Sequence, residues 1–252
     1  MFLSRKPLGL ILVLSLVLFG LCPVQASRAQ QREIIISEDT SAKNLNLGRA
    51  IYTIDRVSQG RIYTKVSSIG CPAMYETKKG KKIYGFITCG HEKELGDWVY
   101  LDAACTKYIG KVTKLKINSQ VDAAFVRVTN DSYKPSSKVL YQDASGQKGG
   151  VKIASQAKAD AGTKVWKSGA STYLTKGKIL DTNATTATNS GLYTGLYMTN
   201  LKAKAGDSGG LLYMKKKKGG YAALGICKSS NSQYSFYIPL KKITKALDIK
   251  VL

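Results

Sequence analysis

Short runs of β-branched, aromatic and aliphatic residues recur along the chain, and clusters of Gly, Asn, Ser and Lys separate them. Ten of these runs have the length and composition of β-strands. They occupy residues 51–54, 61–66, 83–88, 98–101, 111–115, 123–128, 164–167, 210–213, 222–226 and 235–238. Only one segment has helical spacing, because Leu240, Ile243 and Leu247 fall on one face of a helix that follows Pro239. The pattern predicts an all-β fold of the sandwich or barrel type with a helix near the C-terminus.

A polar stretch divides the predicted strands into two groups. Residues 129–150 contain one proline and three glycines and show no strand-like run. We therefore expect an N-terminal barrel over residues 49–133 and a C-terminal barrel, with the helix, over residues 151–252. Residues 134–150 would connect them.

The N-terminus has the layout of a secretory signal. Two basic residues precede an apolar run at 8–21, and small residues follow before Ala26. The apolar run is too short for a membrane-spanning helix, and no second one could anchor the product. Cleavage is expected after Ala26, or alternatively after Ala29, so that the protein is secreted and extracellular. Residues 27–48 then form a short leader, an N-terminal extension or an added edge strand.

The chain is strongly basic, with 39 Lys and Arg residues against 16 Asp and Glu and a net charge of +23. Removing residues 1–26 takes away two basic residues and no acidic ones, which leaves +21. Such a surplus attracts anionic polymers, including those of cell surfaces. The lysines are scattered and no nucleic-acid-binding motif accompanies them, so no specific nucleic-acid partner is expected, and a solvated lysine-rich surface is the favoured interpretation.

Four cysteines follow the signal sequence, namely Cys71, Cys89, Cys105 and Cys227. In an exported chain they permit one or two disulfides, with three possible full pairings. Their spacing matches no zinc motif, and the chain has a single histidine, so no metal site is expected.

The strongest local motif is the run from Gly206 to Gly210, Gly-Asp-Ser-Gly-Gly, directly before a predicted strand. A serine flanked by glycines fits a tight turn in which backbone N–H groups, here those of Gly206 and Ser208, converge on the oxygen of an attacked carbonyl. Ser208 is therefore a candidate nucleophile. A plain structural turn is the alternative interpretation.

His91 is the only imidazole in the chain that could activate such a serine, and it follows the predicted strand 83–88. A carboxylate must orient it, and two Asp-Ala-Ala strings compete, beginning at Asp102 and Asp122. Asp102 is too close along the chain for a strand to leave the cleft and return beside His91. Asp122 opens a predicted strand, so we assign it the orienting role and interpret Asp102 as a turn residue.

The order His91, Asp122, Ser208 resembles the chymotrypsin-like serine peptidases, and most closely the bacterial streptogrisin and alpha-lytic branch. The segments 167–172, 198–205, 223–226 and 236–239 also resemble this branch, and the similarity covers roughly residues 61–252. The resemblance implies two packed six-stranded antiparallel β-barrels with a C-terminal helix.

The resemblance also implies a secreted serine endopeptidase that cleaves polypeptides through an acyl-enzyme, needs no metal or cofactor and acts as a monomer. In this branch an internal cation pairs with the aspartate before the nucleophile. The matching residues here are Lys167 and Asp207, for which we predict an ion pair that supports the oxyanion turn.

Several residues depart from the pattern of this branch. Glu92 replaces the cysteine that usually follows the histidine, so a shifted bridge between Cys71 and Cys89, or one between Cys89 and Cys105, is expected instead. At Lys228 the family has a small serine that hydrogen-bonds the triad aspartate. Lys228 would then point outward, with Ser229 or Ser230 taking that role.

The resemblance places the specificity pocket around Lys202, Ala203, Lys204, Cys227 and Lys228. The three lysines raise the hypothesis of a preference for acidic side chains at the cleaved bond. The histidine that acid-preferring relatives use in this pocket is absent, however, since His91 is the only one.

Two other function classes compete with the endopeptidase. One is a catalytically silent protein of the same fold that binds anionic polymers through its basic surface, although such a binder needs no triad. The other is an esterase or transferase that uses the same three residues.

Overall fold

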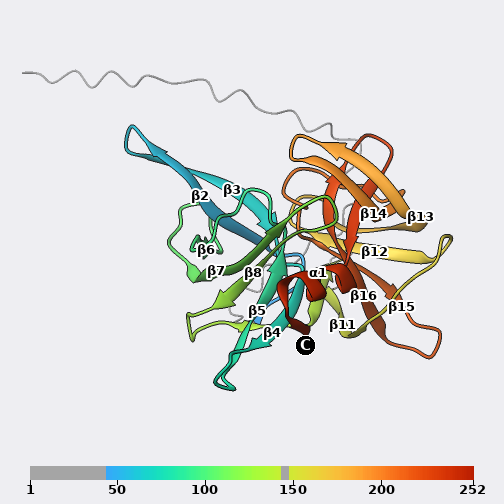
Figure 1. Ribbon diagram of the computed structural model, residues 1–252, viewed down its shortest axis with the longest axis horizontal. Coiled ribbons are helices and arrows are strands. Elements are labelled where there is room, and N and C mark those ends of the chain that lie inside the picture. The colour runs from blue at the N-terminus through green and yellow to red at the C-terminus, as the bar shows by residue number, and fades with distance from the viewer. Residues whose placement is uncertain (1–43, 143–147) are drawn as a thin grey trace, which may run out of the picture. The chain divides into compact units, whose positions relative to one another are not determined.

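The computed structural model describes residues 44–142 and 148–252, whose regular structure is almost entirely β (Figure 1). The predicted signal sequence and the first part of the leader, to residue 43, lie outside the described residues. A two-stranded parallel sheet of β1 (Asn44–Leu45) and β9 (Lys134–Pro135) ties the first described residues to the segment after the N-terminal sheet.

Six strands of the C-terminal half close into a barrel, because β17 pairs with both β14 and β16. Around the barrel they are β16 (Tyr221–Ser230), β15 (Leu211–Lys215), β12 (Lys164–Gly169), β13 (Tyr173–Thr188), β14 (Gly191–Thr199) and β17 (Ser235–Pro239). Two further strands, β10 (Lys138–Gln142) and β11 (Lys148–Gln156), extend this sheet beyond β16.

The N-terminal half forms a second sheet of eight strands. In spatial order they are β18 (Lys250–Val251), β4 (Cys71–Glu76), β5 (Lys82–Thr88), β8 (Asp122–Val128), β7 (Tyr108–Ile117), β6 (Trp98–Tyr100), β2 (Ala50–Ser58) and β3 (Arg61–Ser68). All neighbours in this sheet are antiparallel. Since β5 and β8 are adjacent, the residues after β5 and at the start of β8 lie at the same end of the sheet.

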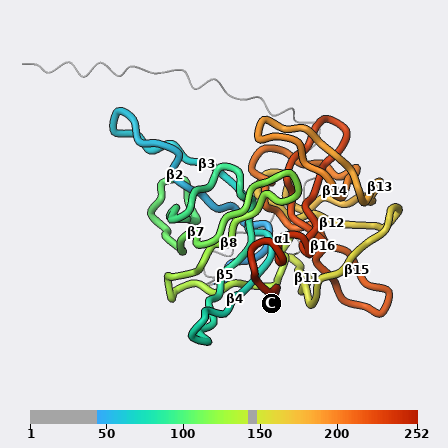
Figure 2. Tube along the Cα trace, viewed as in Figure 1, coloured from blue at the N-terminus to red at the C-terminus, as the bar shows by residue number. Residues whose placement is uncertain are grey.

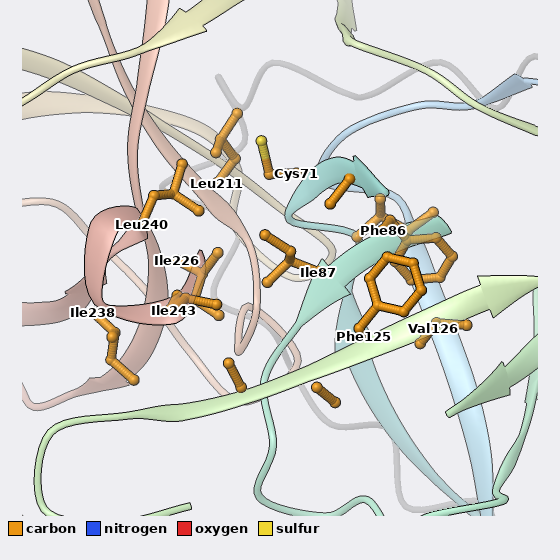
Figure 3. Close-up of a cluster of buried hydrophobic side chains, with 14 of the residues drawn as sticks. Cys71, Phe86, Ile87, Phe125, Val126, Leu211, Ile226, Ile238, Leu240 and Ile243 are labelled. Atoms are coloured by element: carbon orange, nitrogen blue, oxygen red, sulfur yellow. The ribbon is translucent and has the colours of Figure 1, made fainter. Parts of the chain in front are cut away.

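Side chains of both sheets and of the helix α1 (Leu240–Leu247) form one continuous hydrophobic core (Figure 3). It includes Phe86, Ile87, Phe125 and Val126 from the N-terminal sheet, Leu211, Ile226 and Ile238 from the C-terminal sheet, and Leu240 and Ile243 from α1. The helix contacts β7 and β8 as well as β16 and β17, and the trace in Figure 2 shows it where the two halves meet. Burying each large apolar side chain contributes about 1.5–3 kcal/mol, so this shared core holds the halves together.

The predicted fold class is confirmed, with two β-sheets of the double-barrel type and one helix at the predicted residues. Each of the ten predicted strands coincides with an observed one. The sequence pattern missed β4, the β13–β14 hairpin and the short strands β1, β9 and β18. It also missed β10 and β11. Strands β9 and β10 and the start of β11 occupy the stretch 134–150, which was expected to be only a connection.

Candidate active site

Three side chains from both sheets form a hydrogen-bonded chain. The Nδ1 atom of His91 lies 2.8 Å from Oδ2 of Asp122, and its Nε2 atom lies 3.0 Å from Oγ of Ser208. The other carboxylate oxygen of Asp122 accepts the backbone N–H groups of Gly90, at 2.7 Å, and His91, at 2.6 Å. Because an ionised carboxylate only accepts hydrogen bonds, Nδ1 carries the proton and Nε2 is free to accept one from the serine.

The topology explains why these residues meet. His91 follows β5, and Asp122 is the first residue of the neighbouring strand β8, so both lie at one end of the N-terminal sheet. The rival carboxylate, Asp102, instead accepts hydrogen bonds from Thr106 and Lys107 within its own turn. The structure thus brings Asp122, and not Asp102, to the imidazole.

Asp122 is buried, and four donors surround its carboxylate. Burial by itself raises the pKa of Asp122. Hydrogen bonds and positive charge from His91 and Lys228 outweigh that effect and hold the pKa well below its usual value. The carboxylate therefore stays ionised across the range in which a histidine base works.

The turn that carries Ser208 has its backbone fixed from two sides. Gly206 and Gly209 adopt positive φ angles of 94° and 82°. A β-carbon at position 209 would lie 2.5 Å from Oγ1 of Thr88, so a larger residue cannot be accommodated without a shift. Ser68 of the N-terminal sheet donates its hydroxyl to the carbonyl of Gly206, at 2.7 Å, and its N–H to the carbonyl of Ser208, at 2.8 Å.

The backbone N–H groups of Gly206 and Ser208 have no acceptor among residues 44–142 and 148–252. They are the two donors that the motif predicts for an oxyanion hole. A negatively charged oxygen beside Ser208 would satisfy both.

Asp207 and Lys167 form an ion pair beneath this turn, with Nζ 3.1 Å from Oδ2 and both side chains fully buried. The ammonium also donates to Oγ1 of Thr172, at 2.6 Å. The carboxylate accepts further hydrogen bonds from the backbone N–H groups of Ser171, Thr172 and Lys204 and from the Thr172 hydroxyl. Burial raises the pKa of Asp207, but the Lys167 charge and these donors together lower it below the usual value.

A cleft of about 570 Å³ opens beside His91 and Ser208. Of the predicted pocket residues, Lys204, Cys227 and Lys228 line it, whereas Lys202 is exposed elsewhere and Ala203 is not part of its wall. The tip of the β13–β14 hairpin, residues 186–190, forms an additional wall. The sequence pattern contained no signal for this wall, because the hairpin itself was not predicted.

The sequence suggested that Lys228 points outward, but in the structure it points inward. Its side chain is 3% exposed, and Nζ lies 2.7 Å from the same Asp122 oxygen that binds His91. Neither neighbouring serine takes that place. Ser230 donates to the carbonyl of Ala203, and the buried hydroxyl of Ser229 has no partner in the described part of the chain.

The predicted disulfides are not formed, since Cys71, Cys89, Cys105 and Cys227 are all free thiols. Cys71 lies opposite Ile87 in the β4–β5 pair, so Cys89 is displaced diagonally by two residues. Diagonal neighbours are too far apart for the Cβ spacing of a disulfide. Burial raises the pKa of Cys71 and of Cys227 to about 12 and that of Cys89 to about 11, so these thiols are unreactive at neutral pH.

No protein-family model matches the sequence. Solved structures do match the fold. Thermobifida fusca protease A is 22% identical, with a TM-score of 0.64 over 83% of this chain and 98% of that one. Cellulomonas bogoriensis chymotrypsin is 26% identical, with a TM-score of 0.61 over 83% and 98%. Nocardiopsis protease is 24% identical, with a TM-score of 0.63 over 82% and 98%. The chain has the fold of the bacterial chymotrypsin-like serine proteases, in agreement with the resemblance noted in its sequence.

Proposed function

We propose that the protein is a serine endopeptidase that uses Ser208 as nucleophile, His91 as general base and Asp122 as the group that orients the imidazole. The observation that carries the proposal is the continuous hydrogen-bonded chain between these residues, at 2.8 and 3.0 Å. The fold shared with serine proteases supports the same class of hydrolase.

In the proposed reaction, the Ser208 oxygen attacks the peptide carbonyl while Nε2 of His91 takes its proton. The N–H groups of Gly206 and Ser208 stabilise the resulting oxyanion. His91 then gives the proton to the leaving amine, and an acyl-enzyme on Ser208 remains. Water, activated by His91, attacks this ester and restores the free serine.

We further propose that the protein acts outside the cell as a monomer on polypeptide substrates, after removal of residues 1–26. The layout of these residues supports export. Among the described residues, no helix has the length and apolar character needed to cross a membrane.

A fluorophosphonate probe tests the proposed mechanism directly. We expect it to label the wild-type protein, not to label Ser208→Ala, and to label Asp122→Asn at least a hundredfold more slowly. Asp102→Asn is the matched control and should label at the wild-type rate, because Asp102 bonds only within its own turn. Turnover of esters without any cleavage of peptides would favour an esterase. A folded wild-type protein that resists labelling would contradict the proposal and favour a silent binder.

A preference for acidic substrates now depends on Lys204, because Lys202 lies outside the cleft and Lys228 is already bonded to Asp122. One solved structure of this fold, 23% identical, is described as a glutamic acid-specific serine protease that uses a histidine triad in substrate binding. This chain has no histidine besides His91. Profiling on a peptide library should show that the wild-type protein prefers acidic residues at the cleaved bond and that this preference weakens in Lys204→Met. A wild-type preference for apolar or basic residues would rule out the acidic preference.

An anionic polymer is a second proposed partner, and a specific cleft supports it. The cleft, of about 880 Å³, lies beside α1 and the β13–β14 hairpin. Five lysines line it, namely Lys116, Lys158, Lys241, Lys242 and Lys245, against one acidic side chain, Asp160. None of the five belongs to an ion pair within the described residues.

Binding of long-chain inorganic polyphosphate would test this partner. Replacing Lys241, Lys242 and Lys245 by serine should weaken binding at least tenfold, and wild-type binding should fall steeply between 50 and 200 mM salt. The matched control replaces Lys78, Lys79 and Lys81, three exposed lysines of a turn in the N-terminal sheet. Equal losses in both triple variants would show that only net charge matters and that the cleft is not a site.

A further inference from the structure

Lys228 is a buried cation that touches the candidate triad. Its ammonium lies 2.7 Å from Oδ2 of Asp122 and 3.0 Å from Oγ of Ser190, and it sits 4.4 Å from the centre of the Tyr193 ring. Carboxylate, hydroxyl and aromatic face are all favourable partners for a positive charge. The ammonium is thus fully coordinated, with its side chain only 3% exposed.

An irregularity in the barrel explains why a lysine can point inward here. The register between β16 and β17 shifts between Cys227, which pairs with Tyr237, and Ser229, which pairs with Phe236. Lys228 is the extra residue of this bulge. Such bulges redirect a side chain relative to its neighbours, often beside an active site. The bulge therefore aims the lysine across to the N-terminal sheet, where Asp122 begins β8.

We propose that Lys228 is a positioning residue of the triad. It neutralises Asp122 in the resting enzyme. His91 therefore stays uncharged, and able to act as a base, at a lower pH than it would without the lysine. The proposal rests on the triad described under Proposed function. Without Lys228, the buried carboxylate of Asp122 would have no cation beside it and would favour a positive charge on the imidazole. When Lys228 is present, its ammonium already pairs with the carboxylate. Protonation of the imidazole then places a second positive charge beside the first, which is less favourable.

The distances set the size of this effect. The lysine and imidazole nitrogens bind the same oxygen at 2.7 and 2.8 Å, so they lie no more than about 5.5 Å apart. Two like charges at that separation, with an effective dielectric constant of about 20, shift a protonation equilibrium by about two pH units. The direction is fixed by charge, because removal of the lysine must make protonation of the imidazole easier.

Other ionisable groups lie near the triad. They are Cys89 after β5, Glu92 and Lys93 in the following loop, Asp122 of β8, Tyr193 of β14 beside Lys228, Cys227 of β16, Lys204 on the cleft wall, and the Lys167–Asp207 pair beneath Ser208. Among the described residues, only Lys228 places a second cation on the oxygen that binds His91. This contact distinguishes it from the general positive field of the protein.

Lys228 also connects the triad to the cleft wall. Ser190, at the tip of the β13–β14 hairpin, accepts from the ammonium and from the hydroxyl of Tyr193. The same side chain therefore holds the hairpin tip in place relative to Asp122. A purely mechanical role of this kind would change activity equally at every pH, whereas the electrostatic role moves the pH dependence.

Because His91 is the only histidine, nitrogen-15 labelling of histidine followed by NMR titration reports its protonation without any requirement for activity. We expect the titration midpoint to rise by about two pH units in Lys228→Met. Lys228→Arg, which keeps the charge, should stay near the wild-type midpoint. Lys204→Met is the matched control, since it removes a cation from the same cleft without contacting Asp122, and its midpoint should move by less than about 0.3 units.

An unchanged midpoint in Lys228→Met, or equal shifts in Lys228→Met and Lys204→Met, would overturn the proposal. If Lys228→Met does not fold, Lys228→Ser provides the same comparison with a smaller neutral side chain. The acid limb of the kcat/KM profile should follow the NMR midpoint. A protein that shows the expected shift but is not labelled by the fluorophosphonate would refute the proposed function and leave this inference standing.

Discussion

Replacing Lys167 by methionine tests whether the buried ion pair holds the oxyanion turn. The substitution keeps an unbranched side chain, shorter by one atom, and removes its charge. Asp207 would then be a fully buried carboxylate without its cation, and breaking such a pair costs about 3–5 kcal/mol. Four other hydrogen bonds to the carboxylate remain, so we expect the lower end, about 3 kcal/mol.

Urea unfolding followed by tryptophan fluorescence measures this loss. Since small domains have free energies of unfolding of about 5–15 kcal/mol, the variant should still fold and its activity can be compared. Lys164→Met is the matched control, because Lys164 is an exposed lysine on the same strand, β12, and should change stability by less than about 0.5 kcal/mol.

Activity provides a second measurement on the same variant. If the turn loses its support, the N–H groups of Gly206 and Ser208 no longer converge, and kcat should fall by about a hundredfold, comparable to the loss of one oxyanion donor. A destabilisation below about 1 kcal/mol, with unchanged kcat, would refute the reasoning. It would mean that Asp207 is held by its backbone donors alone.

Three further predictions concern acid stability, the thiols and the glycine turn. Folding lowers the pKa values of Asp122 and Asp207. Their contribution to stability is therefore present above the ordinary aspartate pKa and is lost as pH falls below about 4. A urea midpoint that stays constant down to pH 2 would contradict this prediction. Of the four cysteines in the described part of the chain, only the partly exposed Cys105 should react with iodoacetamide in the native protein. Dithiothreitol should leave the melting temperature unchanged, and a drop in melting temperature would reveal a disulfide. Gly209→Ala should abolish fluorophosphonate labelling, because the new β-carbon would collide with Thr88. Gly219→Ala is the control, since Gly219 has a φ of 90° but open space around it, and it should lose only about 1 kcal/mol of stability from backbone strain. Equal labelling of the two variants would argue against the packed turn.

The parts of the site that a short segment determines could be predicted from the sequence. The glycines around Ser208 mark a tight turn whatever surrounds it, and His91 had no rival. Asp122 was found because strand connectivity limits which carboxylate can return to the histidine. Those inferences depend on the geometry of short segments and on the number of residues between two positions, and both can be read from the sequence.

The parts that depend on register could not be predicted. Lys228 points inward because of a bulge between β16 and β17, and a one-residue shift reverses the direction of a side chain. The β13–β14 hairpin has repeated register shifts and long polar, half-exposed stretches, so its alternation is too irregular to predict strands. The expected bridge between Cys71 and Cys89 depended on a cross-strand pairing that is offset by two residues in the structure.

The hydrophobic cluster shared by the two sheets and α1 has a consequence for how the protein resists proteolysis. A peptide bond must leave its sheet and become extended before another protease molecule can cleave it. Because side chains of both halves and of α1 interdigitate in one cluster, opening either half exposes apolar surface of the other. We therefore expect cleavage within the buried strands to follow the rate of global unfolding.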